Sequence, residues 1–120
     1  MIKIGRRGSI SGVIEISGSQ GHVAYPHLSN NPINTLVSIC KKLKQKKLDK
    51  GNKNFQPSNL EFTAINVDNQ AHNVIPARAR TQFNIRYNNF HTSISLKKMI
   101  TKVIRSICKR NKTKYKVEFL

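Results

Sequence analysis

Histidine and tyrosine side chains gather in one short, proline-containing stretch, residues 21–32 of the 120-residue chain. It reads Gly-His-Val-Ala-Tyr-Pro-His-Leu-Ser-Asn-Asn-Pro, and its imidazole and phenol groups can donate hydrogen bonds or transfer protons. Tyr25 and Asn31 each precede a proline, which biases both away from helical backbone angles. We therefore interpret 21–32 as an ordered, extended loop that can present functional side chains. A proline-stiffened connector with surface histidines is the alternative.

Three further places carry groups that could bind a ligand. Arg6 and Arg7 lie between glycines before the first predicted strand, and arginine forks bind carboxylate or phosphate groups through paired hydrogen bonds. Asn73 follows His72 in a short run that ends at a proline, and Arg86 belongs to the polar face of a predicted strand. Each site has an ordinary alternative. Arg6 and Arg7 could simply form a basic entry to the domain, Asn73 could be a turn residue that bonds its own backbone, and Arg86 could be a solvated surface charge.

No motif in the sequence completes a catalytic site on its own. The carboxylates are scattered, and no His-Glu-x-x-His or Cys-x-x-Cys spacing that could hold a metal occurs. Ser9 is not part of a nucleophile elbow. Cys40 and Cys108 occupy apolar helix positions, which predicts reduced thiols in an intracellular, cytoplasmic protein. We therefore expect a chain without a metal site that binds or assists and does not catalyse alone.

The charge is strongly positive, because 22 Lys and Arg residues stand against 5 Asp and Glu residues, a net charge of +17. Such a charge suggests a nucleic-acid partner. The lysines are nevertheless scattered, and no predicted strand carries the closely spaced aromatic residues that stack bases. We predict no specific nucleic-acid partner, and a small basic nucleic-acid-binding module remains the alternative function. Because no run of about 18 apolar residues occurs, we also predict no membrane partner.

Alternating apolar and polar residues predict four strands. Ile10, Gly12, Ile14 and Ile16 share one face of the first, and residues 77–87 form the clearest, with apolar side chains at every second position. In the strand that begins at Asn59, the apolar positions are Leu60, Phe62 and Ala64. The predicted strands are 10–17, 59–67, 77–87 and 115–119.

Two helices are predicted from apolar residues at helical spacing. The first begins at Pro32 after an Asn31 cap and runs to about Lys47, and the second is capped by Ser93. The apolar stripe of the first helix contains Ile33, Leu36, Val37, Cys40 and Leu43, and that of the second contains Leu96, Ile100, Val103, Ile104 and Ile107.

The order of elements is strand, helix, strand, strand, helix, strand. This order predicts an α+β, ferredoxin-like βαββαβ fold, in which two helices cover one face of a four-stranded antiparallel sheet. No repeat or domain-separating linker interrupts residues 1–120, so we expect a single domain. Because this fold hosts many functions, the function has to come from the loops.

Several strings resemble the dimerisation (lid) domain of the zinc aminoacylase and carboxypeptidase family of metallohydrolases. The resemblance runs from Ile2 to Phe119. The strings are Gly5-Arg6-Arg7-Gly8-Ser9, Gly21-His22-Val23-Ala24-Tyr25-Pro26-His27-Leu28, Asn31-Pro32-Ile33, Asn73-Val74-Ile75-Pro76 and Gln82-Phe83-Asn84-Ile85-Arg86-Tyr87.

The resemblance implies a role for each candidate residue. His22 reaches into the active site of a partner subunit and donates a hydrogen bond to the oxyanion. His27, by its position near the predicted helix start, is interpreted as structural. Tyr25 and Asn73 line the same pocket. Arg6, Ser9 and Arg86 bind the carboxylates of a small dicarboxylate substrate. His72 departs from the Thr or Asn usual in the family, so no ligand role is assigned to it.

The resemblance also implies what lies outside this chain. Two zinc ions, held by a separate catalytic domain that flanks this one, activate a water that attacks an amide bond. The chain is then expected to form a homodimer and, as an isolated fragment, to bind no zinc and hydrolyse nothing. A family member that removes a different acyl group stays open as an alternative.

Overall fold

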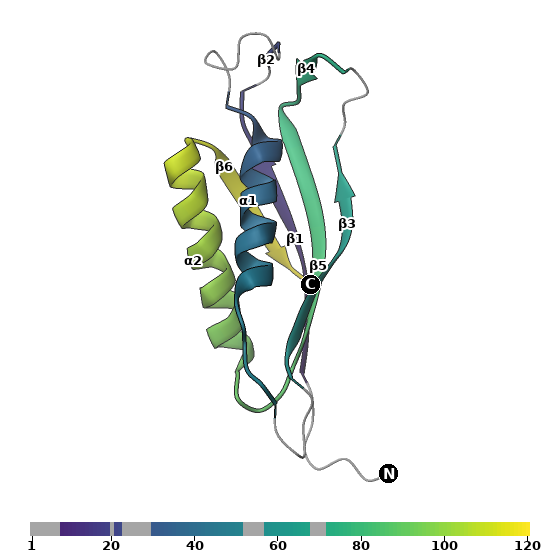
Figure 1. Ribbon diagram of the computed structural model, residues 1–120, viewed down its shortest axis with the longest axis vertical. Coiled ribbons are helices and arrows are strands. Elements are labelled where there is room, and N and C mark those ends of the chain that lie inside the picture. The colour runs from purple at the N-terminus through teal and green to yellow at the C-terminus, as the bar shows by residue number, and fades with distance from the viewer. Residues whose placement is uncertain (1–7, 20, 23–29, 52–56, 68–71) are drawn as a thin grey trace.

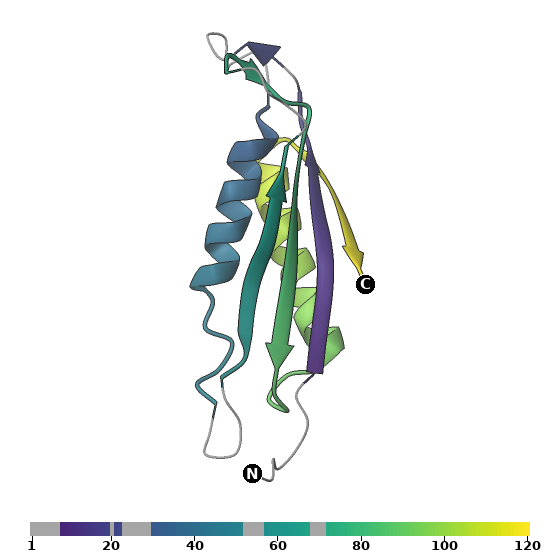
Figure 2. The same cartoon turned by 90° about the vertical axis from the view of Figure 1, so that its right-hand side faces the viewer.

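The computed structural model describes residues 8–19, 21–22, 30–51, 57–67 and 72–120. Its main sheet has the strand order β3-β5-β1-β6, and every neighbouring pair is antiparallel. Figure 2 shows this sheet in front of both helices, so the helices cover one face and leave the other bare. The predicted ferredoxin-like arrangement is confirmed. The elements are β1 Gly8–Ser17, β2 Gly21–His22, α1 Pro32–Gln45, β3 Asn59–Asn66, β4 Val74–Ile75, β5 Arg78–Tyr87, α2 Ser93–Asn111 and β6 Lys114–Phe119.

The core lies between the sheet and the helices, and the alternation predicted for β1 and β5 is confirmed. Ile14 and Ile16 of β1 and Ile85 of β5 are fully buried. Gly12 makes room in this layer, because a Cβ there would lie 2.5 Å from the ring of Phe83. The Phe83 ring crosses above the glycine and meets Phe119 edge to face, with ring centroids 6.2 Å apart.

The first helix is rotated relative to the predicted stripe. Val37, predicted to be buried, is 59% exposed, and Ile39 and Thr35 are buried instead. Both sets of residues fit a helical period, so the sequence could not choose between them. The packing of α1 against the end of α2 decides which residues of α1 are buried. The Thr35 hydroxyl accepts a hydrogen bond of 3.1 Å from Asn111 Nδ2, which turns Thr35 toward α2. Ile33 and Cys40 are partly buried against the core, and Leu36 and Leu43 are buried as predicted.

Helix caps follow the local sequence closely. The Asn31 side chain accepts a hydrogen bond of 3.0 Å from Ile33 N, and Pro32 is the first helical residue, as predicted. The prediction of Ser93 as the second cap is wrong by one residue. Thr92 caps α2 through a reciprocal pair of hydrogen bonds with Ser95, and Ser93 lies inside the helix.

The third strand contains a bulge that alternation could not predict. The register shifts between Phe62 and Ala64, so that Ala64 pairs with Gln82 on the solvent face. The prediction that Ala64 shares a face with Leu60 and Phe62 is therefore wrong. Ile65 pairs with Thr81, and 63% of it is exposed.

A short ribbon stands at the end of the domain where β1 finishes. β2 pairs with β4, and His22 faces Val74 in this pairing (Figure 1). Gly18 lets the chain pass close to the start of α1, since a Cβ there would lie 2.0 Å from Asn30 O. The predicted extended loop thus begins with a strand, β2, that pairs with β4. Residues 23–29, which include Tyr25 and His27, lie outside the described residues.

Candidate functional site

Two predicted ligand-binding residues lie side by side at one end of the sheet. Ser9 of β1 is the direct cross-strand partner of Arg86 of β5, on the bare face. Arg86 Nε donates a hydrogen bond of 3.0 Å to Asn84 Oδ1, and Asn84 Nδ2 donates one of 2.8 Å to Ser11 Oγ. This arrangement holds an exposed guanidinium beside a hydroxyl, which suits a carboxylate ligand. We call Ser9, Ser11, Asn84 and Arg86 the Arg86 cluster.

Sequence reasoning missed the supporting residues of this cluster. Asn84 lies two residues before Arg86 and shares its face of β5, but Ser11 comes from another strand. Their meeting depends on the pairing of Ser11 with Asn84, which only the register of β1 against β5 reveals. Arg6, the third predicted carboxylate ligand, lies outside the described residues.

The other predicted residues lie at the opposite end of the sheet. Asn73 is exposed in a turn directly before β4, and His22 belongs to the strand that pairs with β4. For His22 only the backbone is described. About 27 Å of strand, the eight-residue rise from Ser9 to Ser17, separates the Arg86 cluster from this ribbon. The predicted site residues that the structure describes therefore form two groups that no small ligand can touch together in one chain.

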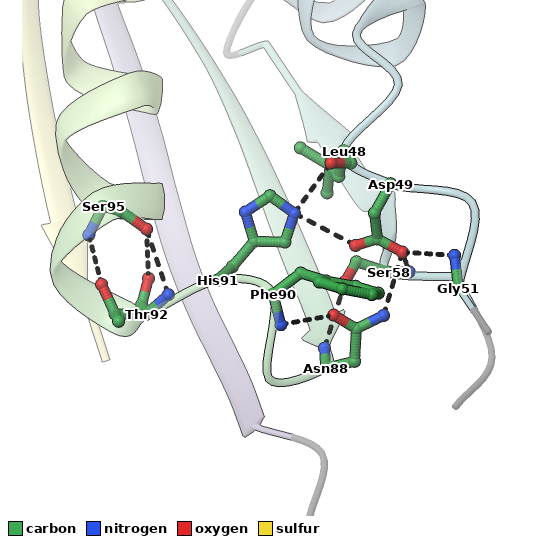
Figure 3. Close-up of polar contacts among 9 residues, drawn as sticks. All are labelled: Leu48, Asp49, Gly51, Ser58, Asn88, Phe90, His91, Thr92 and Ser95. Atoms are coloured by element: carbon green, nitrogen blue, oxygen red, sulfur yellow. Dashed lines mark hydrogen bonds and ion pairs between the residues drawn. The ribbon is translucent and has the colours of Figure 1, made fainter. Parts of the chain in front are cut away.

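A buried polar cluster that the sequence did not single out joins two connections of the domain (Figure 3). It lies near the Arg86 cluster, because Asn59, which follows Ser58, pairs with Arg86. Asp49, from the loop after α1, accepts hydrogen bonds at Oδ1 from Gly51 N at 2.9 Å, Ser58 N at 3.1 Å and Asn88 Nδ2 at 2.9 Å. Its Oδ2 lies 3.0 Å from His91 Nε2. We call this set the Asp49 cluster; it ties the loop between α1 and β3 to the connection between β5 and α2.

The Asp49 carboxyl remains ionised in its buried place. Its side chain is only 9% exposed, and burial raises its pKa, but the hydrogen bonds from Ser58, Asn88 and Gly51 outweigh burial and lower the pKa to about 2. His91 Nε2 also lies 2.8 Å from Leu48 O, so this ring nitrogen faces two acceptors and must carry a proton. The cluster is a structural anchor, because Asp49 bonds both Ser58 at the end of the loop before β3 and Asn88 in the connection between β5 and α2.

The described residues do not provide a metal centre. Among them, no three His, Cys, Asp or Glu side chains come close enough to hold an ion. Burial raises the pKa of the Cys40 thiol to about 11 and also raises that of Cys108, which disfavours the thiolate form that metals and disulfide exchange require. No described helix is long and apolar enough to cross a membrane.

Comparison with known proteins identifies the class. Residues 4–112 match the family model of the peptidase dimerisation domain, and the chain belongs to this family. The expected resemblance is thereby confirmed. Solved structures agree in fold: a tripeptidase from Staphylococcus aureus gives a TM-score of 0.76 at 15% identity, over 95% of this chain and 29% of that one. An amidase of the hydantoinase/carbamoylase family from Burkholderia vietnamiensis gives 0.78 at 13% identity, over 95% and 28%.

Two curated bacterial relatives are both named succinyl-diaminopimelate desuccinylase. The succinyl-diaminopimelate desuccinylase of Pelagibacter ubique is 56% identical over 99% of this chain and 31% of its own length. That of Ehrlichia chaffeensis is 52% identical over 97% of this chain and 29% of its own length. The chain thus spans about 30% of the length of these relatives.

Proposed function

We propose that this chain is the dimerisation domain of a longer succinyl-diaminopimelate desuccinylase. That enzyme would hydrolyse N-succinyl-LL-2,6-diaminoheptanedioate to succinate and LL-2,6-diaminoheptanedioate, in the cytoplasm, on the route to diaminopimelate and lysine. The observation that carries the proposal is the 56% identity to a curated desuccinylase along 119 residues. The Arg86 cluster supports it, because a dicarboxylate substrate needs cationic, hydrogen-bonding partners.

Zinc belongs to the remainder of the proposed enzyme. Two ions in a flanking catalytic domain would supply the activated water, and the described residues of this chain contain no cluster that fits them. The contribution of this chain is to bind and orient the substrate and to stabilise charge. Arg86, with Ser9 beside it, would bind a substrate carboxylate through its guanidinium.

The two ends of the domain would serve two different active sites. The Arg86 cluster, with Arg6, would bind substrate in the active site of its own subunit. His22, Tyr25 and Asn73 would reach the active site of the partner, where the His22 imidazole donates a hydrogen bond to the oxyanion. The separation of about 27 Å between the groups supports this division, because a small dicarboxylate cannot span it.

The activity is tested with the full-length protein and a series of N-acyl diamino acids. We expect succinate release from N-succinyl-LL-2,6-diaminoheptanedioate with the highest kcat/KM of the series. Faster release of another acyl group would instead support a different amidohydrolase of the same family. The 120-residue chain alone is expected to release no succinate and to bind no zinc, and hydrolysis by the purified chain would contradict this.

We propose that the homodimer forms along β3 and the flank of α1 beside it. β3 is an edge strand of eight residues without a lysine, whereas the opposite edge, β6, carries two. Exposed lysines protect an edge from pairing. Both elements carry an exposed apolar residue, Ile65 on β3 and Val37 on α1. The two elements lie next to each other, since Lys44 Nζ of α1 donates a hydrogen bond of 2.7 Å to Leu60 O of β3. A twofold axis beside β3 would join two sheets through backbone hydrogen bonds.

Replacement of both Val37 and Ile65 with lysine is expected to raise the dimer dissociation constant at least about tenfold. The reason is that two new charges would be buried against their own copies. Sedimentation equilibrium of the isolated chain measures this constant. The matched control replaces Ile94 and Tyr115, exposed apolar residues elsewhere, with lysine. An equal loss in the control, or a strictly monomeric wild-type chain at high concentration, would count against the β3 interface.

A further inference from the structure

A groove runs along the outer surface of the helical layer, on the side away from the sheet. α1 and α2 lie antiparallel next to each other (Figure 1), and the hollow along them has a volume of about 730 Å³. On α2 it extends from Ser95 to Arg110, about 22 Å at the rise of a helix. None of the residues of the Arg86 cluster or the Asp49 cluster lines it. We call it the interhelical groove.

The walls of the interhelical groove are cationic on both sides. Neither helix contains an Asp or a Glu, so the cations have no acidic neighbour within their own helices. Lys98 and Lys102 stand one turn apart, a like-charge spacing that destabilises a helix unless a counter-charge is present. The cationic residues that line the groove are Lys41, Lys42, Lys46, Lys98, Lys102 and Arg110.

An apolar line separates the two walls. Met99, Val103 and Ile107 of α2 repeat every four residues and form the floor. Met99 is partly exposed, and a methionine side chain adapts its shape to different ligands. A binding partner that fits this pattern has an apolar ridge along its centre and negative charges along both flanks.

We propose that the interhelical groove binds an acidic amphipathic helix of another protein. Such a helix carries an apolar seam with carboxylates on either side, at the one-turn spacing that matches Lys98 and Lys102. A second copy of this chain would instead bring the same cations into contact with themselves. Single-stranded nucleic acid is less well matched, because no aromatic side chain lines the groove for base stacking.

The test uses the 120-residue chain and a fluorescent helical peptide of about 18 residues, five turns long. The peptide has leucines along one seam and glutamates beside them, and its control has the same composition in scrambled order. At a salt concentration of about 0.15 M, anisotropy titration is expected to show the patterned peptide binding at least about tenfold more tightly than the scrambled one. Equal binding of the two peptides would overturn the proposal.

Two charge-matched variants separate the groove from the overall charge. Lys98→Glu with Lys102→Glu is expected to weaken binding of the patterned peptide at least about tenfold, whereas Lys114→Glu with Lys116→Glu on β6 changes it less than about twofold. Circular dichroism confirms that both variants fold. Equal weakening by both would reduce the effect to net charge and overturn the proposal. Tighter binding of an oligothymidylate that displaces the peptide would also overturn the proposal, because it would assign the groove to nucleic acid.

Discussion

Replacement of His22 with alanine in the full-length protein is expected to lower kcat by about 10²–10³ while KM changes little. The proposed hydrogen bond from the imidazole strengthens only as negative charge develops on the carbonyl oxygen, so its loss raises the barrier more than it weakens substrate binding. Steady-state kinetics with the succinylated substrate measure both constants. A rise in KM with unchanged kcat would assign His22 to substrate binding instead.

Complementation tests whether His22 acts across the dimer. Dimers of His22→Ala or of Arg86→Ala contain only defective sites, but a mixed dimer would contain one site with both residues intact. Equal mixing and subunit exchange are expected to restore about a quarter of the wild-type activity, since half of the dimers are mixed and one of their two sites is complete.

The matched control for complementation mixes His22→Ala with Asn73→Ala. Both residues belong to the same end of the domain, so every site would lack one of them and no activity should return. Failure of the first mixture to recover activity, when size exclusion shows that subunits have exchanged, would place His22 and Arg86 in different roles from those proposed here.

Replacement of Asp49 with alanine is expected to lower the free energy of unfolding by about 3 kcal/mol. The carboxylate accepts three hydrogen bonds at Oδ1, so its removal takes away the acceptor shared by Gly51 N, Ser58 N and Asn88 Nδ2. It also removes the charge that lies beside His91. Urea unfolding of the isolated chain at neutral pH measures the loss. Glu118→Gln, on exposed β6, removes one negative charge elsewhere and is expected to have little effect.

The contribution of Asp49 also fixes a pH dependence. Its folded pKa, about 2, lies below the ordinary value of 3.8, so the stabilisation is fully present above about pH 4 and is lost as the pH falls toward 2. The shift corresponds to about 2 kcal/mol. Unfolding curves of Asp49→Asn should therefore lose less stability over this range than those of the wild type and of Glu118→Gln. Parallel curves for all three proteins would contradict the assignment.

Local patterns predicted most of the scaffold, because they report which side chains are buried. The alternation in residues 78–87 indicates a strand with one buried face. The Asn31-Pro32 pair indicates a helix start, because the missing N–H of proline costs no hydrogen bond at the first helical position. Short pairings leave no such signal. β2 and β4 have two residues each, too few for any periodicity, and they form because distant segments meet.

The sequence by itself determined the fold class, the start of the first helix and the list of candidate residues with ligand-binding groups. Only the tertiary structure decided which of them meet. Ser9 and Arg86 are 77 positions apart and become neighbours through the β1–β5 register. The same register sets them about 27 Å of strand away from the ribbon that contains His22. Asp49 and His91, from two connections, form a buried pair that neither segment indicates. The physical reason is that the pattern of buried residues can be recognised along a continuous stretch of sequence. Which distant side chains become neighbours depends instead on which strands pair and in which register.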